Sequence, residues 1–176
     1  PYKQNIFGRF SLATYNTFSD IRESNHRISS SFQLNIDNVN NSKFSLETFI
    51  NYRGNLDAEN NNGQNLRIFN LGFQYEATPT LKFSLGRRIN PRANSLGAID
   101  GFQVEKSFGS YYAAAIVGFR PEFTNFSVDA NLLQYGGYFG HHTSSKNLYS
   151  ETTLGLMEQR NNGAIDRRYI YLQHFS

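Results

Sequence analysis

Two neighbouring histidines, His141 and His142, are the first candidates in this sequence for metal ligands or acid–base residues. A hydrolytic site would draw on His141, His142 or His174, on Asp100 or Asp129, and on Ser144 or Ser145. No spacing among these residues is diagnostic of catalysis. Adjacent residues of a strand also point to opposite faces, so the two histidines cannot readily share one ion. The sequence therefore predicts no catalytic residue, no metal site and no cofactor.

Charged side chains form the second candidate group, because they recur at alternate positions of several segments. Seven cations and six anions share this pattern: Arg9, Arg27, Lys43, Arg53, Lys82, Arg88 and Arg167 with Asp37, Glu47, Glu76, Glu105, Asp129 and Glu151. The two signs are interspersed, which favours a structural network of ion pairs across neighbouring strands. The alternative is a selective pore with opposed basic and acidic walls.

The elements that would carry these charges are amphipathic strands. Residues 27–37 alternate between an apolar and a polar row, the signature of a strand with one apolar and one wet face. This stretch is also long enough to cross a bilayer at a tilt. We expect the following apolar side chains to face lipid: Ile28, Phe32, Leu34, Ile36, Phe44, Leu46, Ile50, Phe69, Leu71, Phe73, Leu81, Phe83 and Leu85.

Ten such strands can be placed along the chain, an even number as in bacterial barrels. They are expected at residues 5–18, 27–37, 43–53, 66–77, 81–89, 102–108, 111–119, 126–142, 148–159 and 167–175. Longer connections follow the odd strands, the last of them at residues 160–166, and shorter ones follow the even strands. This asymmetry is typical of outer-membrane barrels. The predicted fold is all-β: an antiparallel, up-and-down transmembrane β-barrel with short periplasmic turns and longer extracellular loops.

Composition limits the other classes of protein. The chain has 176 residues, no cysteine and a net charge of only +3, so one domain is expected over 1–176 and nucleic-acid binding is unsupported. The mean hydropathy of −0.54 and the lack of a run of about 20 apolar residues exclude a helical membrane protein. A barrel stays compatible, because alternating strands average out as polar.

Arginines concentrate near the predicted long-loop rim. They are Arg87, Arg88, Arg92, Arg120, Arg160, Arg167 and Arg168, and the same loops contain Asp100, Glu122, Glu158 and Asp166. Guanidinium groups suit the phosphates of lipopolysaccharide. Pairing with the local acids is the favoured interpretation, because each of these loops carries its own carboxylate.

Several segments resemble uncharacterised, porin-like outer-membrane β-barrels of Bacteroidota. The segments are LGRRINPR from Leu85, GAIDGFQVEK from Gly97, GFRPEF from Gly118, LQYGGYFG from Leu133 and GAIDRRYIY from Gly163. Such proteins are often longer, so the resemblance implies that this chain is either a whole barrel or a part of a larger one. It carries over no functional residue.

The sequence thus predicts a bacterial outer-membrane β-barrel with a structural, pore-like or docking role, and not an enzyme. Its partners would be the lipid bilayer, lipopolysaccharide and other outer-membrane subunits. Two alternatives stay open. One is an outer-membrane protease or acyl hydrolase with catalysis at the extracellular rim, which requires His141 or His142 on the long-loop rim. The other is a soluble ligand-binding β-barrel or sandwich, which requires the apolar rows to point inward.

Overall fold

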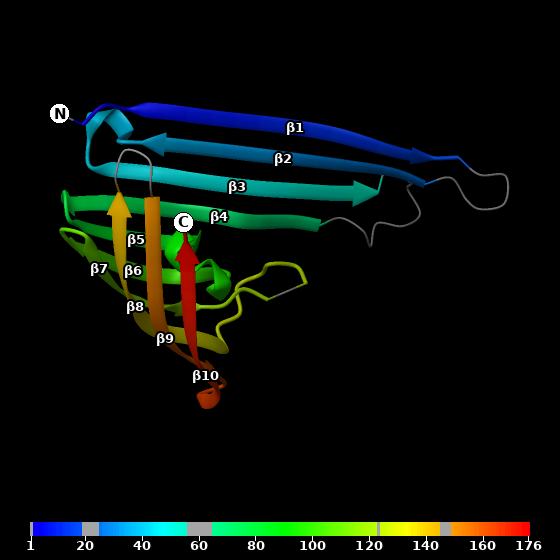
Figure 1. Ribbon diagram of the computed structural model, residues 1–176. Helices are drawn as coiled ribbons and strands as arrows, with labels where there is room; N and C mark the ends of the chain where they lie inside the picture. The colour runs from blue at the N-terminus through cyan, green and yellow to red at the C-terminus, as the bar shows by residue number, and fades with distance from the viewer. Residues whose placement is uncertain (1, 19–24, 56–64, 123, 145–148) are drawn as a thin grey trace.

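One antiparallel sheet of ten strands makes up nearly the whole fold, and each strand pairs with the next along the chain (Figure 1). The computed structural model describes residues 2–18, 25–55, 65–122, 124–144 and 149–176. The strands are β1 (Asn5–Thr17), β2 (Asn25–Asp37), β3 (Phe44–Asn55), β4 (Asn65–Thr78), β5 (Leu81–Ile89), β6 (Ala98–Phe108), β7 (Tyr111–Phe119), β8 (Leu132–Ser144), β9 (Tyr149–Asn161) and β10 (Ala164–Phe175). Two short 3₁₀ helices, η1 (Val39–Asn41) and η3 (Pro91–Leu96), lie in the connections.

The predicted all-β, antiparallel, up-and-down order of ten strands is therefore confirmed. β5 and β7 have the predicted bounds, and most other ends shift by one to four residues. No helix in the described ranges is long and apolar enough to span a membrane.

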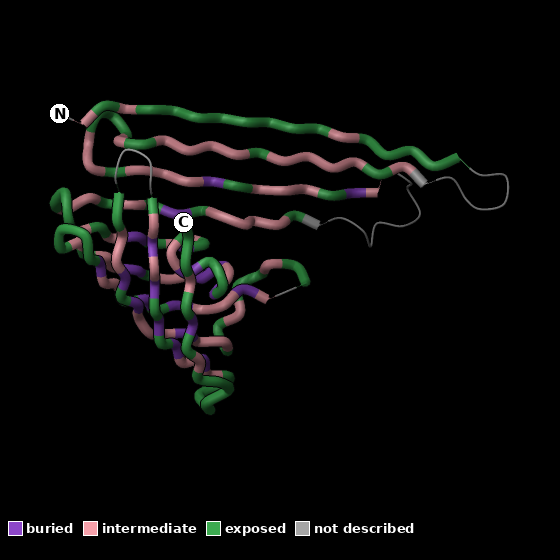
Figure 2. The backbone as a smooth tube through the Cα atoms, viewed as in Figure 1, coloured by how far each residue is buried: buried purple, intermediate pink, exposed green. Residues whose placement is uncertain are grey.

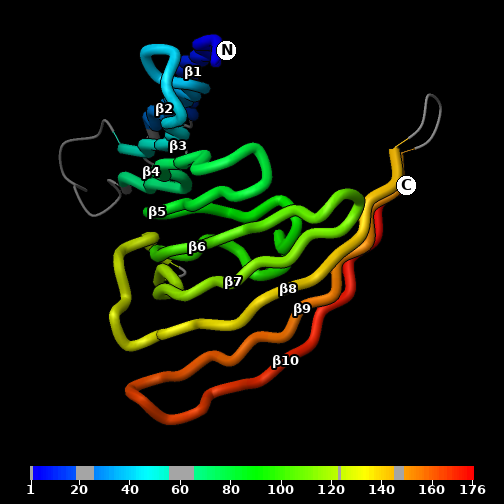
Figure 3. Tube along the Cα trace, turned by 90° about the vertical axis from the view of Figure 1, so that its left-hand side faces the viewer, coloured from blue at the N-terminus to red at the C-terminus, as the bar shows by residue number. Residues whose placement is uncertain are grey.

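The sheet is strongly curved and open. β1 to β3 run side by side as long, nearly straight strands, and the twist of the sheet turns β8 to β10 steeply across them (Figure 1). β1 and β10 form the two edges, and neither pairs with a further strand among the described residues (Figure 3). The helix η3 contacts β5 on one side and β9 and β10 on the other, so it lies inside the curve.

The convex face carries a continuous apolar surface. Strand register aligns Phe32 with Ile50, Leu46 with Phe73, and Phe73 with Leu85, so the apolar rows of neighbouring strands join. Its large side chains are well exposed from one edge of the sheet to the other: Phe10 68%, Phe73 55%, Leu85 60%, Leu156 61%, Ile170 70% and Leu172 71%. A contiguous apolar surface of this extent is rare on soluble monomers.

β1 and β2 carry no buried residue among those described, whereas buried residues gather towards β8 to β10, where the concave face packs into a small core (Figure 2). That core joins two η3 residues to side chains of β6 to β10: Ala93, Leu96, Ile99, Tyr112, Ile116, Tyr138, Met157 and Tyr171. The rings of Tyr112, Tyr138 and Tyr171 pack in this core, and the hydroxyls of Tyr112 and Tyr138 are hydrogen-bonded within it. The inward-folded connection η3 therefore covers part of the concave wall.

Two predicted boundaries are wrong. Residues 126–131 alternate like a strand, yet β8 begins only at Leu132. Asp129 lies in the preceding connection and accepts a hydrogen bond from the Asn131 backbone at 3.0 Å, so it is not part of the sheet. The sequence also predicts a long loop at residues 160–166, but Asn162 and Gly163, with φ of 50° and 81°, form a two-residue turn between β9 and β10.

Phe69 is the one predicted lipid-facing residue on the other face. The register of β3 and β4 shifts between Phe49 and Ile50, which marks a bulge in β4. Because of the bulge, the Phe69 ring stacks on Phe49 of the concave row, with ring centroids 5.4 Å apart, and also contacts Phe126. The other predicted lipid-facing residues lie in the convex row.

Candidate functional site on the concave face

The connection that enters the concave face is fixed by Asn90 and Pro91. Asn90 caps η3, because its side-chain oxygen accepts from the Arg92 backbone N–H at 2.9 Å, and Pro91 occupies the first helical turn. The same Asn90 side chain donates to Gln103 Oε1 at 3.0 Å and to Tyr138 Oη at 2.8 Å. One residue thus starts the helix and anchors it to β6 and β8.

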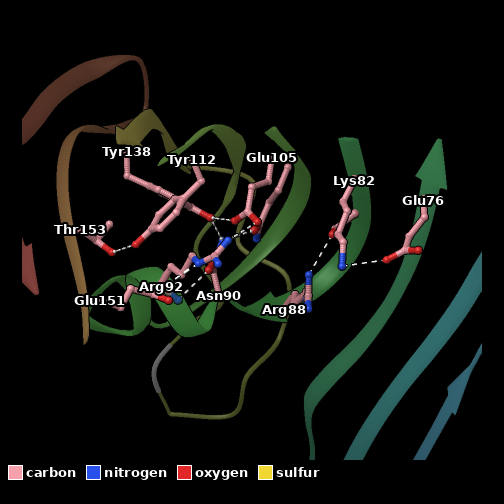
Figure 4. A network of polar contacts seen from close by, with 12 residues as sticks. Glu76, Lys82, Arg88, Asn90, Arg92, Glu105, Tyr112, Tyr138, Glu151 and Thr153 are labelled. Carbon is pink, nitrogen blue, oxygen red and sulfur yellow. Dashed lines mark hydrogen bonds and ion pairs between the residues drawn. The ribbon is translucent and has the colours of Figure 1, made fainter. Parts of the chain in front are cut away.

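Anchoring η3 places the Arg92 guanidinium between two carboxylates on opposite parts of the wall (Figure 4). Arg92 Nε lies 3.1 Å from Glu151 Oε1 on β9, and Nη1 pairs with Glu105 on β6. The guanidinium carbon stands 3.9 Å above the ring centre of Tyr112 on β7. An arginine held by two acids and an aromatic face combines ion pairing with a cation–π contact.

Tyrosine hydroxyls also donate hydrogen bonds to both carboxylates. Tyr138 donates to Glu105 Oε2 at 2.5 Å, and Tyr149 donates to Glu151. Tyr112 bonds instead with the Thr153 hydroxyl at 2.6 Å, which fixes the ring beneath the guanidinium. Buried charges are tolerated only when paired and hydrogen-bonded, and both acids meet this condition.

The electrostatic balance of the cluster favours the charged arginine. Burial by itself lowers the pKa of Arg92, but the adjacent carboxylates of Glu105 and Glu151 outweigh it and raise that pKa above its usual value. Two carboxylates face one guanidinium, so the cluster retains one net negative charge. It can therefore hold a cation but offers little to an anion.

A cavity of about 620 Å³ adjoins this cluster and extends along the wall towards β4. Its lining includes both acids, Tyr149 and Arg92, together with Lys82 and Arg88 on β5. Those two cations are already engaged, since Lys82 Nζ lies 2.8 Å from Glu76 and Arg88 Nη2 lies 3.1 Å from Glu47. The concave wall is thus a series of ion pairs around an accessible space.

The predicted lumen charges fall mainly on this concave row, but their pairing differs from expectation. The sequence predicts ion pairs between neighbouring strands. Glu47 pairs with Arg88, and Lys43 donates to the Ala77 carbonyl at 2.8 Å. Among the described residues, no ion pair joins Arg9, Asp37 or Arg53 to another charge. The ion pairs described here therefore lie between β3 and β10.

Local pairing at the long-loop rim is confirmed for several arginines. Arg87 Nε lies 2.5 Å from Asp100, Arg167 Nε lies 3.0 Å from Asp166, and both Arg160 and Arg168 pair with Glu158. Arg92 departs from this prediction, because it leaves the rim and pairs inside the curve. Glu122 also departs from it, since its carboxylate accepts bonds from Thr124 and Asn125 instead of pairing with Arg120.

The histidine pair lies at the opposite rim from the one a rim hydrolase requires. His141 pairs in register with Tyr111, next to the short Gly109–Ser110 turn, and its ring lies 4.7 Å from the Tyr111 ring. His142 stacks on Tyr112, so the two imidazoles point to opposite faces as predicted. Among the described residues no three His, Asp or Glu side chains gather as metal ligands. Ser145 lies outside the described residues.

Sequence reasoning missed the cluster around Arg92. The Asn90–Pro91 pair was a readable signal for a short helical turn. Nothing local in the sequence indicates that this turn folds inward, because Glu105 and Glu151 lie 13 and 59 residues away from Arg92. Neither family models, nor curated proteins, nor solved structures gave a match to this chain.

Proposed function

We propose that this chain forms an outer-membrane β-barrel of a Gram-negative bacterium and acts as a pore-like protein. The observation that carries the proposal is the exposed apolar surface of the convex face, which includes Leu85 and Leu172, 60% and 71% exposed at β5 and β10. In water such a surface would be costly, since exposed apolar area loses about 25 cal/mol per Å² relative to burial. Lipid acyl chains cover it without that cost.

The polar side chains of the concave row also support this proposal. Its charges and amides, such as Glu47, Gln74 and Lys82, suit a water-filled lumen. A lumen needs the two sheet edges to be joined, either directly by β1 and β10 or through further strands. In a closed barrel η3 would narrow the passage, and the 620 Å³ cavity beside it would be the remaining path for solutes.

Conductance in planar bilayers tests the proposal. The purified chain is expected to give steady single-channel steps. Lys82→Glu replaces a cation of the cavity lining, paired with Glu76 of the neighbouring strand, by an anion, so cation-over-anion permeability should rise several-fold. Lys3→Glu, the same charge change on an exposed residue outside the strands, is the control and should leave selectivity unaltered. A protein that stays monodisperse without detergent and conducts nothing would contradict the proposal.

A further inference from the structure

The groups around Arg92 form a ready-made site for a guanidinium ion. The Arg92 receptacle consists of the Glu105 and Glu151 carboxylates, the Tyr112 ring face, and the hydroxyls of Tyr138 and Tyr149. Its occupant is the chain's own arginine. We infer that this receptacle is a binding site for organic cations that carry a guanidinium group, and that such a ligand competes with Arg92 for it.

The geometry matches this ligand class more closely than it matches a simple cation. Two carboxylates approach different edges of the planar group, Glu151 at Nε and Glu105 at Nη1. The ring of Tyr112 lies against the flat side, with the guanidinium carbon at 3.9 Å. A planar, delocalised cation with several N–H donors satisfies both directions together, whereas a strongly hydrated ammonium or metal ion satisfies only the charge.

Charge makes the receptacle attractive once Arg92 leaves it. Glu151 is buried, with 8% of its side chain exposed, and Glu105 is 22% exposed. Removing the arginine leaves two partly buried carboxylates without a counter-charge, which is strongly unfavourable. The nearest other cations lining the cavity cannot replace it freely, because Lys82 pairs with Glu76 and Arg88 with Glu47.

The helix that presents Arg92 does not depend on that side chain for its place. Asn90 bonds to Gln103 and Tyr138, Gln173 donates to the Pro91 carbonyl at 3.0 Å, and Ala93 is fully buried. Truncating Arg92 should therefore empty the receptacle while η3 stays against the wall. The adjoining cavity gives a small solute a route to the vacated space.

Chemical rescue tests the inference in detergent, without reference to conductance. Arg92→Ala is expected to unfold at a temperature several degrees below the unaltered chain. Ethylguanidinium at millimolar concentration should restore that loss with a saturable dose dependence. It should shift the unfolding temperature of the unaltered chain only at higher concentration, because there it must displace Arg92. Ethylurea, a neutral compound of similar shape, and sodium chloride at equal ionic strength are the controls.

Three results would overturn the inference. Ethylurea or sodium chloride could restore stability as well as ethylguanidinium does, or ethylguanidinium could have no effect. Rescue could also persist in Arg92→Ala combined with Glu105→Gln and Glu151→Gln, which removes both carboxylates. If Arg92→Ala folds only when ethylguanidinium is present, the inference is supported. If Arg92→Ala folds neither with nor without ethylguanidinium, the same rescue by ethylguanidinium, ethylurea and sodium chloride is measured on Arg92→Lys. The assay reads binding alone, so a missing channel would contradict the proposed function without affecting this result.

Discussion

Tyr171 lies directly over Gly155 of the neighbouring strand, in the space that a Cβ atom would occupy. A Cβ built at Gly155 would come within 2.1 Å of the Tyr171 ring, and Tyr171 itself is only 8% exposed. Tyr112 lies over Gly140 in the same way. These glycines are needed for close packing of the rings on the concave face, since no other residue leaves the room.

Gly155→Ala should therefore destabilise the fold by about 1–3 kcal/mol, the usual cost of overpacking a tight site. Gly8→Ala is the matched control in β1, because a Cβ there meets its nearest atom at 3.9 Å and fits without displacement. Denaturant unfolding in detergent, followed by circular dichroism, measures both. Equal stability of the two variants would contradict the packing described for Tyr171.

Glu122, in the β7–β8 connection, gives a prediction for pH. Hydrogen bonds from the Thr124 hydroxyl and from backbone N–H groups hold the pKa of Glu122 below its usual value. A lowered pKa means that these bonds stabilise the loop above the unfolded-state pKa and are lost as pH falls through the folded-state pKa. Thr124→Ala should move the pKa upward towards its usual value. Carboxyl titration by NMR checks the direction, and an unchanged pKa would refute the role of Thr124.

The strands themselves were predictable from the sequence, because alternation of side chains along residues such as 27–37 is the direct consequence of a pleated strand. Where the structure differs from the predicted strands, the cause is local. Asn161, Asn162 and Gly163 form part of a polar run that suggested a loop, although Asn–Gly is also a strong signal for a two-residue hairpin turn. Alternation predicts the wrong face for Phe69, because a bulge adds one residue to β4.

The alternation of side chains does not predict the Arg92 receptacle. The sequence places Glu105 and Glu151 in the polar row, but it predicts that Arg92 pairs at the rim. Local patterns describe a strand and its two faces. They do not say which connection folds back over the sheet, because that depends on contacts between residues far apart in the sequence.

Arg87, on β5, joins three other segments at the long-loop rim. It pairs with Asp100 of β6 and donates to the Ile68 carbonyl of β4 at 2.8 Å and to the Phe126 carbonyl in the β7–β8 connection. Its side chain is 8% exposed. Asp100→Asn would leave a buried guanidinium without its counter-charge, and should cost about 3–5 kcal/mol of unfolding free energy.

Arg168→Gln is the control for that change. Arg168 also pairs with an acid, Glu158, but its side chain is 68% exposed, so its removal should cost less than about 1 kcal/mol. Denaturant midpoints of the two variants provide the comparison. Similar losses for Asp100→Asn and Arg168→Gln would show that Arg87 is not the anchor of the rim.

The curvature of the sheet and the separation of its apolar and polar faces are two aspects of the same arrangement of strands. Bending the sheet brings β5 close to β9 and β10 around η3, and it turns the apolar rows outward. The large apolar side chains of the convex row are thereby left exposed, and the proposed membrane location would surround them with acyl chains. We therefore expect lipid to cover the convex face and water to reach the concave one.

Quenching of a fluorophore by brominated lipids shows which face lipid covers, and the absence of cysteine from the sequence allows single labels. Labels at Phe73→Cys and Leu172→Cys on the convex row should be strongly quenched in reconstituted vesicles. Labels at Gln74→Cys and Gln173→Cys, the next residues along the same strands but on the concave row, should be quenched little. Equal quenching of neighbouring positions, or no quenching at any of them, would contradict the account.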